Sequence, residues 1–287
     1  MKFKSLVIIS SIFILMGCAT AKSETPENPG AGQSQAAPAK QEQAPAQEAG
    51  KEIPKLRETK RTIRFSDGKI DEYTVSAYTA EGLLQGETVY SASGSVLGTT
   101  EYVYKNNLLT QKTVRNELKE IRSRVVYEYD GKGLLTKETI NDKDGKPLSA
   151  YAYSYDASGS LVSREFSAAG VKLAVTAYTY KGKLLSAGET KNDAGEKISS
   201  FENTYDKDNN LVTQKVFSGT GSIVQTITSV WKNGLEVSRE QANDKGAAVR
   251  RETMEYGSSK ELIKKSIEDI QGKSKQSIEY EYAAETK

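Results

Sequence analysis

After residue 65, short runs in which apolar and aromatic residues alternate with polar ones are separated by turn residues. The segment 151–170 reads YAYSYDASGSLVSREFSAAG and shows the pattern most clearly. Tyr151, Tyr153 and Tyr155 alternate with small residues, which puts their rings on one face of an extended strand. The following Asp, Ser and Gly159 supply turn chemistry, and a second apolar run then leads to the next turn signal. The segment therefore predicts a β-hairpin followed by a turn.

The same pattern recurs about every 25 residues. In each unit a leucine opens the second strand: Leu83, Leu108, Leu134, Leu161, Leu184, Leu211, Leu235 and Leu262. An aromatic residue precedes each leucine: Tyr78, Tyr104, Tyr129, Tyr155, Tyr180, Tyr205, Trp231 and Tyr256. A glycine follows the leucine in all units but the second: Gly94, Gly145, Gly170, Gly195, Gly221, Gly246 and Gly272. The second unit offers Asn116-Glu117 instead, and Asn tolerates the left-handed conformation. A period of about 25 residues accommodates two strands and two short turns.

This repeat predicts an all-β fold, an antiparallel meander of about eight hairpins that forms an elongated, twisted sheet. A low mean hydropathy of −0.59 favours such a thin sheet over a thick core. Residues 114–124 and 260–270 have some helical character, but they occupy strand positions in the repeat, so we expect strands there. Asp67-Gly68 resembles the tail of a truncated first unit. Tyr280 and Tyr282 resemble a terminal strand that lacks its partner.

The N-terminus has the pattern of an export signal. Lys2 and Lys4 precede an apolar run that is too short to span a bilayer as a helix. The sequence Leu15-Met16-Gly17-Cys18 resembles the lipobox of bacterial lipoproteins. That resemblance implies cleavage before Cys18, the only cysteine of the chain, and attachment of lipid to its sulfur. Ala19, in place of the Asp that favours inner-membrane retention in enteric bacteria, points toward the outer membrane. An ordinary signal peptide with an incidental cysteine is the alternative.

Three regions follow from these patterns. Residues 1–17 form the signal peptide, 18–54 a lipidated, disordered tether, and 55–287 the repeat domain. The tether holds five of the six prolines and no aromatic residue, so it cannot bury enough apolar area to fold. Residues 55–65 are locally basic; we interpret them as a solvated leading strand, with contact to anionic lipid or wall polymer as the alternative.

Composition argues against several classes of function. Loss of Lys2 and Lys4 with the signal peptide makes the basic residues equal in number to the 38 acidic ones, which argues against nucleic-acid binding. The chain has no histidine and one cysteine, so it offers no disulfide framework, no Cys/His metal site and no Ser-His-Asp site. Residues 142–145 and 206–210 resemble the openings of calcium loops but lack the remaining ligand positions, and we interpret them as turn caps. We expect no enzymatic activity, no cofactor and no metal.

The units YEYDGKGLLTKE (127–138), YSYDASGSLVSRE (153–165) and NTYDKDNNLVTQK (203–215) resemble the YD repeats of RHS-type proteins. They also resemble, more loosely, MORN-variant repeats. The resemblance covers about residues 65–287 and implies a scaffold of stacked hairpins. Large RHS shells contain far more than eight units, so what the resemblance implies here is the scaffold and not a closed shell that encapsulates a toxin; whether the sheet is open, closed or two-layered does not follow from the sequence.

These observations favour a lipid-anchored envelope protein that acts as a non-enzymatic scaffold for protein interaction or envelope structure. It would reside at the outer membrane, on the periplasmic side or the cell surface. The alternative is a carbohydrate- or peptide-binding adhesin that uses an exposed tyrosine face; the weaker third is an immunity-like module. Aromatic rings supply large, rigid contact areas with a polar tip. The candidate binding residues are Tyr129, Tyr153, Tyr155, Tyr180, Tyr205 and Trp231.

Overall fold

The computed structural model describes residues 56–284, which form 18 β-strands joined by short turns. The strands are β1 (Leu56–Phe65), β2 (Ile70–Tyr78), β3 (Leu84–Ser91), β4 (Val96–Lys105), β5 (Leu108–Asn116), β6 (Ile121–Tyr129), β7 (Leu135–Asn141), β8 (Pro147–Tyr155), β9 (Leu161–Ala168), β10 (Val171–Lys181), β11 (Leu184–Asn192), β12 (Lys197–Tyr205), β13 (Leu211–Ser218), β14 (Ile223–Lys232), β15 (Leu235–Asn243), β16 (Ala248–Tyr256), β17 (Leu262–Asp269) and β18 (Ser274–Ala284). The signal peptide, Cys18 and the tether lie outside these residues. Both segments with helical character are strands and turns, as expected.

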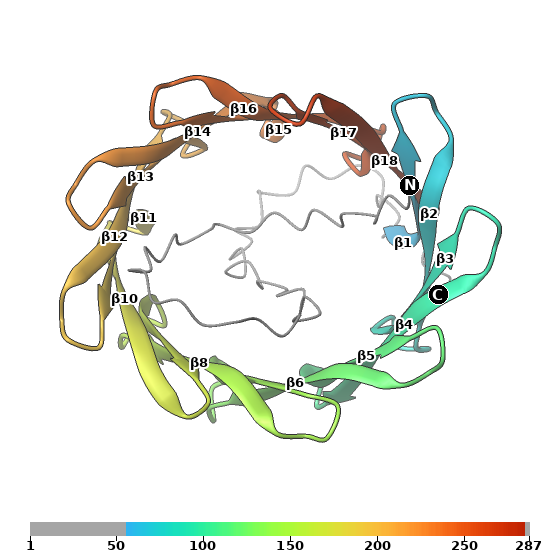
Figure 1. Ribbon diagram of the computed structural model, residues 1–287, viewed down its shortest axis with the longest axis horizontal. Helices are drawn as coiled ribbons and strands as arrows, with labels where there is room; N and C mark the ends of the chain where they lie inside the picture. Colours follow the sequence, from blue (N-terminus) through green and yellow to red (C-terminus); the bar gives the residue numbers. More distant parts are fainter. Residues whose placement is uncertain (1–55, 285–287) are drawn as a thin grey trace, which may run out of the picture. The chain divides into compact units, whose positions relative to one another are not determined.

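Each strand pairs antiparallel with the next one along the chain, and β1 also pairs with β18. The meander is therefore a closed barrel, with the first strand beside the last (Figure 1). The predicted all-β antiparallel meander is confirmed, whereas the predicted elongated sheet was wrong, because the meander closes on itself. The truncated first unit and the unpaired last strand are complementary halves: β1 supplies the partner that β18 lacks, so the 18 strands make nine equivalent pairs. Closure also removes the free edges that an open sheet would present.

The turns between units follow the predicted chemistry with two exceptions, one in the second unit and one in the last, where Lys273 (φ +50°) and not Gly272 is the left-handed residue. Gly145 adopts φ +84°, and the Oδ1 atom of Asp142 accepts hydrogen bonds from the backbone N–H groups of Asp144 and Lys146. This confirms residues 142–145 as a capped turn. In the second unit the left-handed residue is Lys119 (φ +63°) and not Asn116. Asn116 instead takes the capping role that Asp142 has in the next unit.

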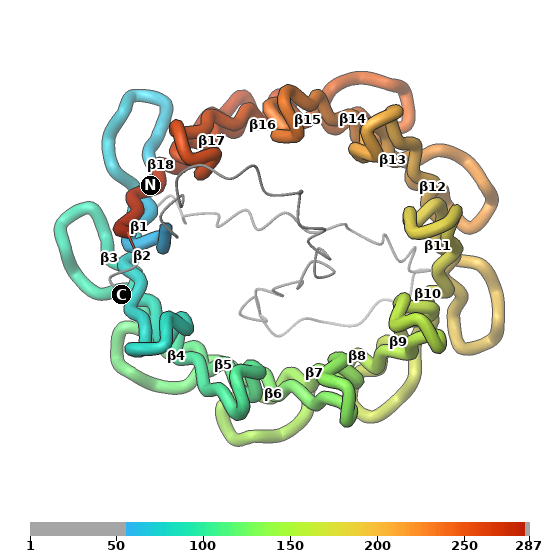
Figure 2. The backbone as a smooth tube through the Cα atoms, turned by 180° about the vertical axis from the view of Figure 1, so that it is seen from behind, coloured from blue at the N-terminus to red at the C-terminus, as the bar shows by residue number. Residues whose placement is uncertain are grey.

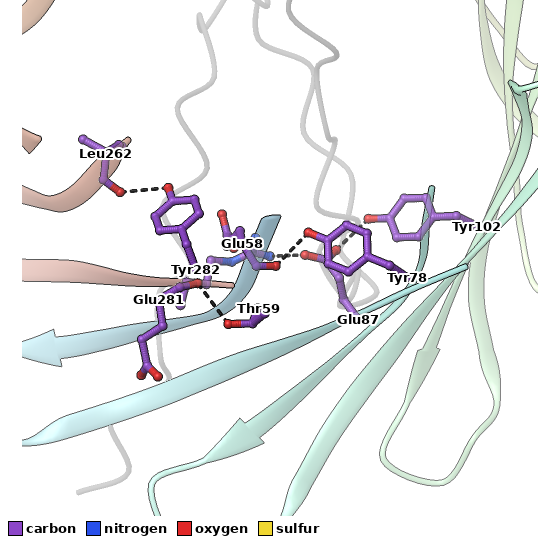
Figure 3. A network of polar contacts seen from close by, with 9 residues as sticks. Glu58, Thr59, Tyr78, Glu87, Tyr102, Leu262, Glu281 and Tyr282 are labelled. Carbon is purple, nitrogen blue, oxygen red and sulfur yellow. Dashed lines mark hydrogen bonds and ion pairs between the residues drawn. The ribbon is translucent and has the colours of Figure 1, made fainter. Parts of the chain in front are cut away.

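The two faces of the barrel wall differ in crowding. On β4, Tyr102 and Tyr104 are half-buried, whereas Val103 between them is 50% exposed. Side chains converge on a concave face and splay on a convex one, so this difference is expected if the tyrosines point into the barrel. Figure 3 shows the rings of Tyr78 and Tyr102 on the concave side of the sheet and the Glu281 carboxylate on the opposite side. We call these sides the inner and the outer face.

The inner face does not form a packed core. Among residues 56–284, only Val125, Ala174 and Ile267 are buried hydrophobic residues, and no large side chain is fully buried. This agrees with the size of the ring that the backbone traces (Figure 2). With neighbouring strands about 4.8 Å apart, 18 strands give a backbone radius of about 14 Å even without tilt, which side chains alone do not fill. Stability must therefore come mainly from strand pairing and contacts between neighbouring side chains.

In the part of the chain that the structure describes, no helix has the length and apolar character needed to cross a membrane.

Candidate functional site

A girdle of aromatic residues lines the inner face near one rim of the barrel. It contains the last aromatic residue of each even-numbered strand: Tyr78, Tyr104, Tyr129, Tyr155, Tyr180, Tyr205, Trp231, Tyr256 and Tyr282. In eight of the nine, the polar tip donates a hydrogen bond to a backbone carbonyl 19 or 20 residues earlier in the chain. The Tyr155 hydroxyl, for example, donates to the Leu135 carbonyl oxygen at 2.8 Å. Within residues 56–284, Tyr104 is the one member without such a bond.

A β-bulge explains why these carbonyls are available. In the hairpin of β6 and β7, Tyr129 lies opposite Leu135 and Glu128 lies opposite Lys137, so Thr136 is an extra residue on one side. The irregular ladder beside the bulge leaves the Leu135 carbonyl free to accept the Tyr155 hydroxyl from the next even-numbered strand. The same shift occurs at the girdle residue in every hairpin that joins an even-numbered strand to the next odd-numbered one, from β2–β3 to β16–β17. It also occurs in the pair β1–β18. Through eight of its nine members, the girdle thus links a unit to the previous one.

A second ring of inner-face residues, which we call the belt, lies near the middle of the odd-numbered strands. Its members are Arg61, Glu87, Lys112, Glu138, Arg164, Gly188, Gln214, Arg239 and Lys265. Charge alternates in sign from Arg61 to Arg164. Gly188 interrupts the belt because the Phe201 ring occupies the space that a side chain would need.

A network of polar contacts surrounds the first two members of the belt, Arg61 and Glu87 (Figure 3). The Arg61 guanidinium lies 3.1 Å from the Glu58 carboxylate and 2.7 Å from that of Glu87. The Tyr102 hydroxyl donates to Glu87 at 2.6 Å, and the Tyr78 hydroxyl donates to the Glu58 carbonyl at 2.7 Å. Burial, together with the bond to the Glu87 carboxylate, raises the pKa of Tyr102 well above its usual value. These contacts join the consecutive strands β1 to β4. The junction of β1 with β18 is bridged instead by ion pairs of the outer face, Lys60 with Glu281 at 3.1 Å and Arg64 with Glu279 at 2.8 Å.

Two further carboxylates of the inner face sit in contrasting environments. Glu138 is 3% exposed and accepts a hydrogen bond from Tyr153, and burial raises its pKa. Glu252 is equally buried, and burial alone would raise its pKa, but ion pairs with Lys265 and Arg250 hold that pKa below the usual value. Burial therefore disfavours the ionised form of Glu138, whereas the ion pairs favour the ionised form of Glu252.

The inner face combines hydrogen-bonded aromatic side chains with paired charges. The girdle phenols are held as hydrogen-bond donors; burial raises the pKa of Tyr129 and Tyr155, and that of Tyr282 to about 12. Glu87 is neutralised by Arg61. Within residues 56–284, no group of three or more His, Cys, Asp or Glu side chains is placed to hold a metal ion. The arrangement offers aromatic faces and ordered charges.

All six candidate binding residues lie on the inner face. Five of them, Tyr129, Tyr155, Tyr180, Tyr205 and Trp231, belong to the girdle, and Tyr153 lies one tier deeper against Glu138. Sequence reasoning missed the belt. Its members stand three or four residues after each repeat leucine, as Glu87 follows Leu83, so that spacing was the signal that would have revealed it.

A shallow pocket of about 480 Å³ lies outside the barrel, between the turn at 65–68 and strands β16 to β18. Three of its four cations are already engaged: Arg64 pairs with Glu279, Arg251 pairs with Glu240 at 2.7 Å, and Lys275 pairs with Glu268 at 2.8 Å.

No protein-family model and no curated protein matches the chain. Among solved structures, a porin-like protein from Bacteroides uniformis is similar with a TM-score of 0.42 and 15% identity over 79% of this chain and 98% of that one. A porin-like protein from Bacteroides vulgatus gives 0.38 and 11% over the same shares. The toxin structure TcdB2-TccC3 gives 0.32 and 12% over 71% of this chain, which spans only 15% of that chain. At these scores and identities, the likenesses identify neither a family nor a function.

Proposed function

We propose that this chain is a lipid-anchored envelope protein whose barrel stands in water as a non-enzymatic scaffold. Its anchor would be Cys18, and the tether of residues 19–54 would hold the barrel away from the membrane surface. The observation that carries the proposal is the polarity of the outer face. The scaffold role is the one expected from the sequence, but the sheet that carries it is a closed ring.

Charged residues are distributed around the whole outer face. Near the middle of the strands they include Lys60, Glu101, Arg124, Lys137, Glu165, Glu189, Glu202, Lys215, Glu240, Arg251, Lys264 and Glu279. Several form ion pairs with neighbours, such as Lys172 with Glu165 at 3.0 Å and Lys137 with Glu128 at 3.6 Å. Most of the remaining outward positions carry Thr, Ser, Ala or Val.

This pattern is the reverse of what lipid requires. A barrel that spans a bilayer needs an outward apolar band, and each outward Lys or Arg at the midplane costs about 2–4 kcal/mol. The six cations among the residues just named would cost on the order of 12–24 kcal/mol, more than a typical domain's net stability. In water the same surface is favourable, because exposed charges keep a protein soluble and discourage association. The outer face therefore supports a barrel that stands outside the bilayer.

The test separates the anchor from the barrel. Wild-type protein should fractionate with membranes, and Cys18→Ala should be released into the soluble fraction. The purified Cys18→Ala protein should stay monodisperse without detergent and should not float with phospholipid vesicles. Retention of Cys18→Ala in the membrane with normal processing would contradict the anchor. Flotation of that variant with vesicles would contradict a barrel that stands in water.

A second candidate function is binding of a ligand inside the barrel. It is favoured by the position of the aromatic residues, since a ligand of the tyrosine face would have to enter the ring rather than lie on the exterior.

A further inference from the structure

We infer that the girdle and belt together form a binding site for a neutral oligosaccharide chain, held inside the barrel. This inference deepens the second candidate function. It requires the closed barrel but does not depend on the lipid anchor.

The girdle presents ring faces rather than hydroxyl groups. The Cβ atom of Tyr180 is on β10, while its hydroxyl donates to the Leu161 carbonyl on the neighbouring strand β9 at 3.0 Å. A side chain fixed to the wall at both ends lies along the wall, so one face of its ring is turned to the barrel interior. Its only polar group is already used. What remains for a ligand is a flat apolar surface, repeated at a spacing of two strands, about 10 Å.

Pyranose rings suit such a surface. One face of a sugar ring carries mainly C–H groups and stacks on an aromatic ring, while its hydroxyl groups point outward from the edge and need both donors and acceptors. The belt supplies both kinds of partner beside the aromatic tiers: Lys112 and Arg164 donate, and the side-chain amide of Gln214, whose nitrogen donates to Asn203, has an oxygen that accepts. Arg164 also lies 5.2 Å from the centre of the Tyr151 ring, so charge and ring face are adjacent.

The same features disfavour other polymers. An extended peptide is commonly bound by adding a strand to a sheet edge, but every strand in this barrel is paired on both sides. A polyanion would find three of the five belt cations, Arg61, Arg239 and Lys265, already paired with carboxylates of the barrel. A lipid chain would need a continuous apolar channel, whereas the belt is charged at seven of its nine positions. A neutral chain with many hydroxyl groups is the ligand that meets both tiers.

The experiment uses the full chain carrying Cys18→Ala and two probes, chitohexaose and maltohexaose. Trp231 is the only tryptophan and belongs to the girdle, so its fluorescence reports directly on ligand at this site. We expect saturable binding of at least one hexasaccharide, with a change in Trp231 emission and a matching calorimetric isotherm. Tyr180→Leu removes a ring face and should weaken binding about tenfold. Tyr180→Phe keeps the face and should bind within about twofold of the parent.

The matched control is Tyr90→Leu, which removes a ring of the outer face that stacks on Tyr73. It should leave the affinity unchanged, and melting curves will show that each variant is folded. The inference is overturned if neither hexasaccharide binds at a sugar concentration of about 10 mM, which is on the order of the weakest useful affinity. It is overturned as well if Tyr90→Leu weakens binding as much as Tyr180→Leu. It is also overturned if a synthetic peptide of residues 19–54 binds and the sugars do not. Failure of sugar binding would leave the release of Cys18→Ala from the membrane unaffected, so the two proposals fail separately.

Discussion

Glu58 on the first strand lies opposite Tyr282 on the last strand, next to a bulge at Thr59. The same arrangement occurs inside single hairpins, where Tyr256 lies opposite Leu262 next to a bulge at Ile263. The junction between the chain ends therefore reproduces the contacts within the other units. Since each unit is stabilised mainly by its neighbours, closing the ring gives the terminal strands the partners that an open array would lack.

The girdle hydrogen bonds should be measurable one at a time. Tyr155→Phe removes the bond to the Leu135 carbonyl and should lower the free energy of unfolding by about 1 kcal/mol. Tyr104→Phe is the matched control, because Tyr104 makes no girdle bond within residues 56–284, and its effect should be close to zero. Urea denaturation of both variants measures the difference. Equal effects would show that the girdle bonds do not stabilise the barrel.

The turn glycines should divide by backbone conformation. Gly145 has φ +84° with open space around it, so Gly145→Ala should cost about 1–2 kcal/mol through backbone strain alone. Gly131 is equally open but does not have a positive φ, and Gly131→Ala should be neutral or slightly stabilising. Melting temperatures compare the two. A harmless Gly145→Ala would contradict the left-handed turn.

Gly188 is required for a different reason. A Cβ atom there would collide with the Phe201 ring, so Gly188→Ala should destabilise the barrel by about 1–3 kcal/mol. Phe201→Leu should relieve the collision, and the double variant should lose less stability than the two single variants combined. Additive losses in a double-mutant cycle would mean that the two residues do not compete for this space.

Glu252 and Glu138 should give opposite pH dependences. The ion pairs that lower the pKa of Glu252 provide stability above its unfolded value near 4.5, and this stability is lost as pH falls through the folded pKa. Glu252→Gln should therefore destabilise the protein by about 2–3 kcal/mol at pH 7, and the difference from wild type should shrink in acid. Thermal unfolding between about pH 3 and pH 8 measures this, and a difference independent of pH would contradict it.

For Glu138, burial raises the pKa, so stability is full below the unfolded value near 4.5 and decreases as pH rises through the folded pKa. Glu138→Gln keeps an acceptor for Tyr153 and should stabilise the protein at pH 7, with the gain vanishing in acid. Destabilisation of Glu138→Gln at neutral pH would show that the ionised carboxylate is favourable where it lies.

The strands could be predicted from the sequence because each hairpin carries its own period-two pattern and turn residues, as in 151–170. Closure could not be predicted in the same way, because it depends on the twist added over many strands and on two half-units more than 200 residues apart, such as Glu58 and Tyr282. The girdle tyrosines were visible as repeats, but their bonds to bulge carbonyls depend on ladder irregularities that have no simple sequence signal. The belt was hidden because its members differ in charge and size, from Glu87 to Gly188.

The closure of the ring can be tested most directly by cross-linking its two ends. Ile63 on β1 lies directly opposite Ile278 on β18. In the Cys18→Ala chain, which has no other thiol, the pair Ile63→Cys and Ile278→Cys should form a disulfide under mild oxidation, detected as a reductant-sensitive change in mobility on a denaturing gel. The pair Ile63→Cys and Ile227→Cys on the distant strand β14 should not form one. Cross-linking of the first pair alone is the result that a closed barrel predicts. Free thiols in the first pair under conditions where the protein is folded would contradict closure.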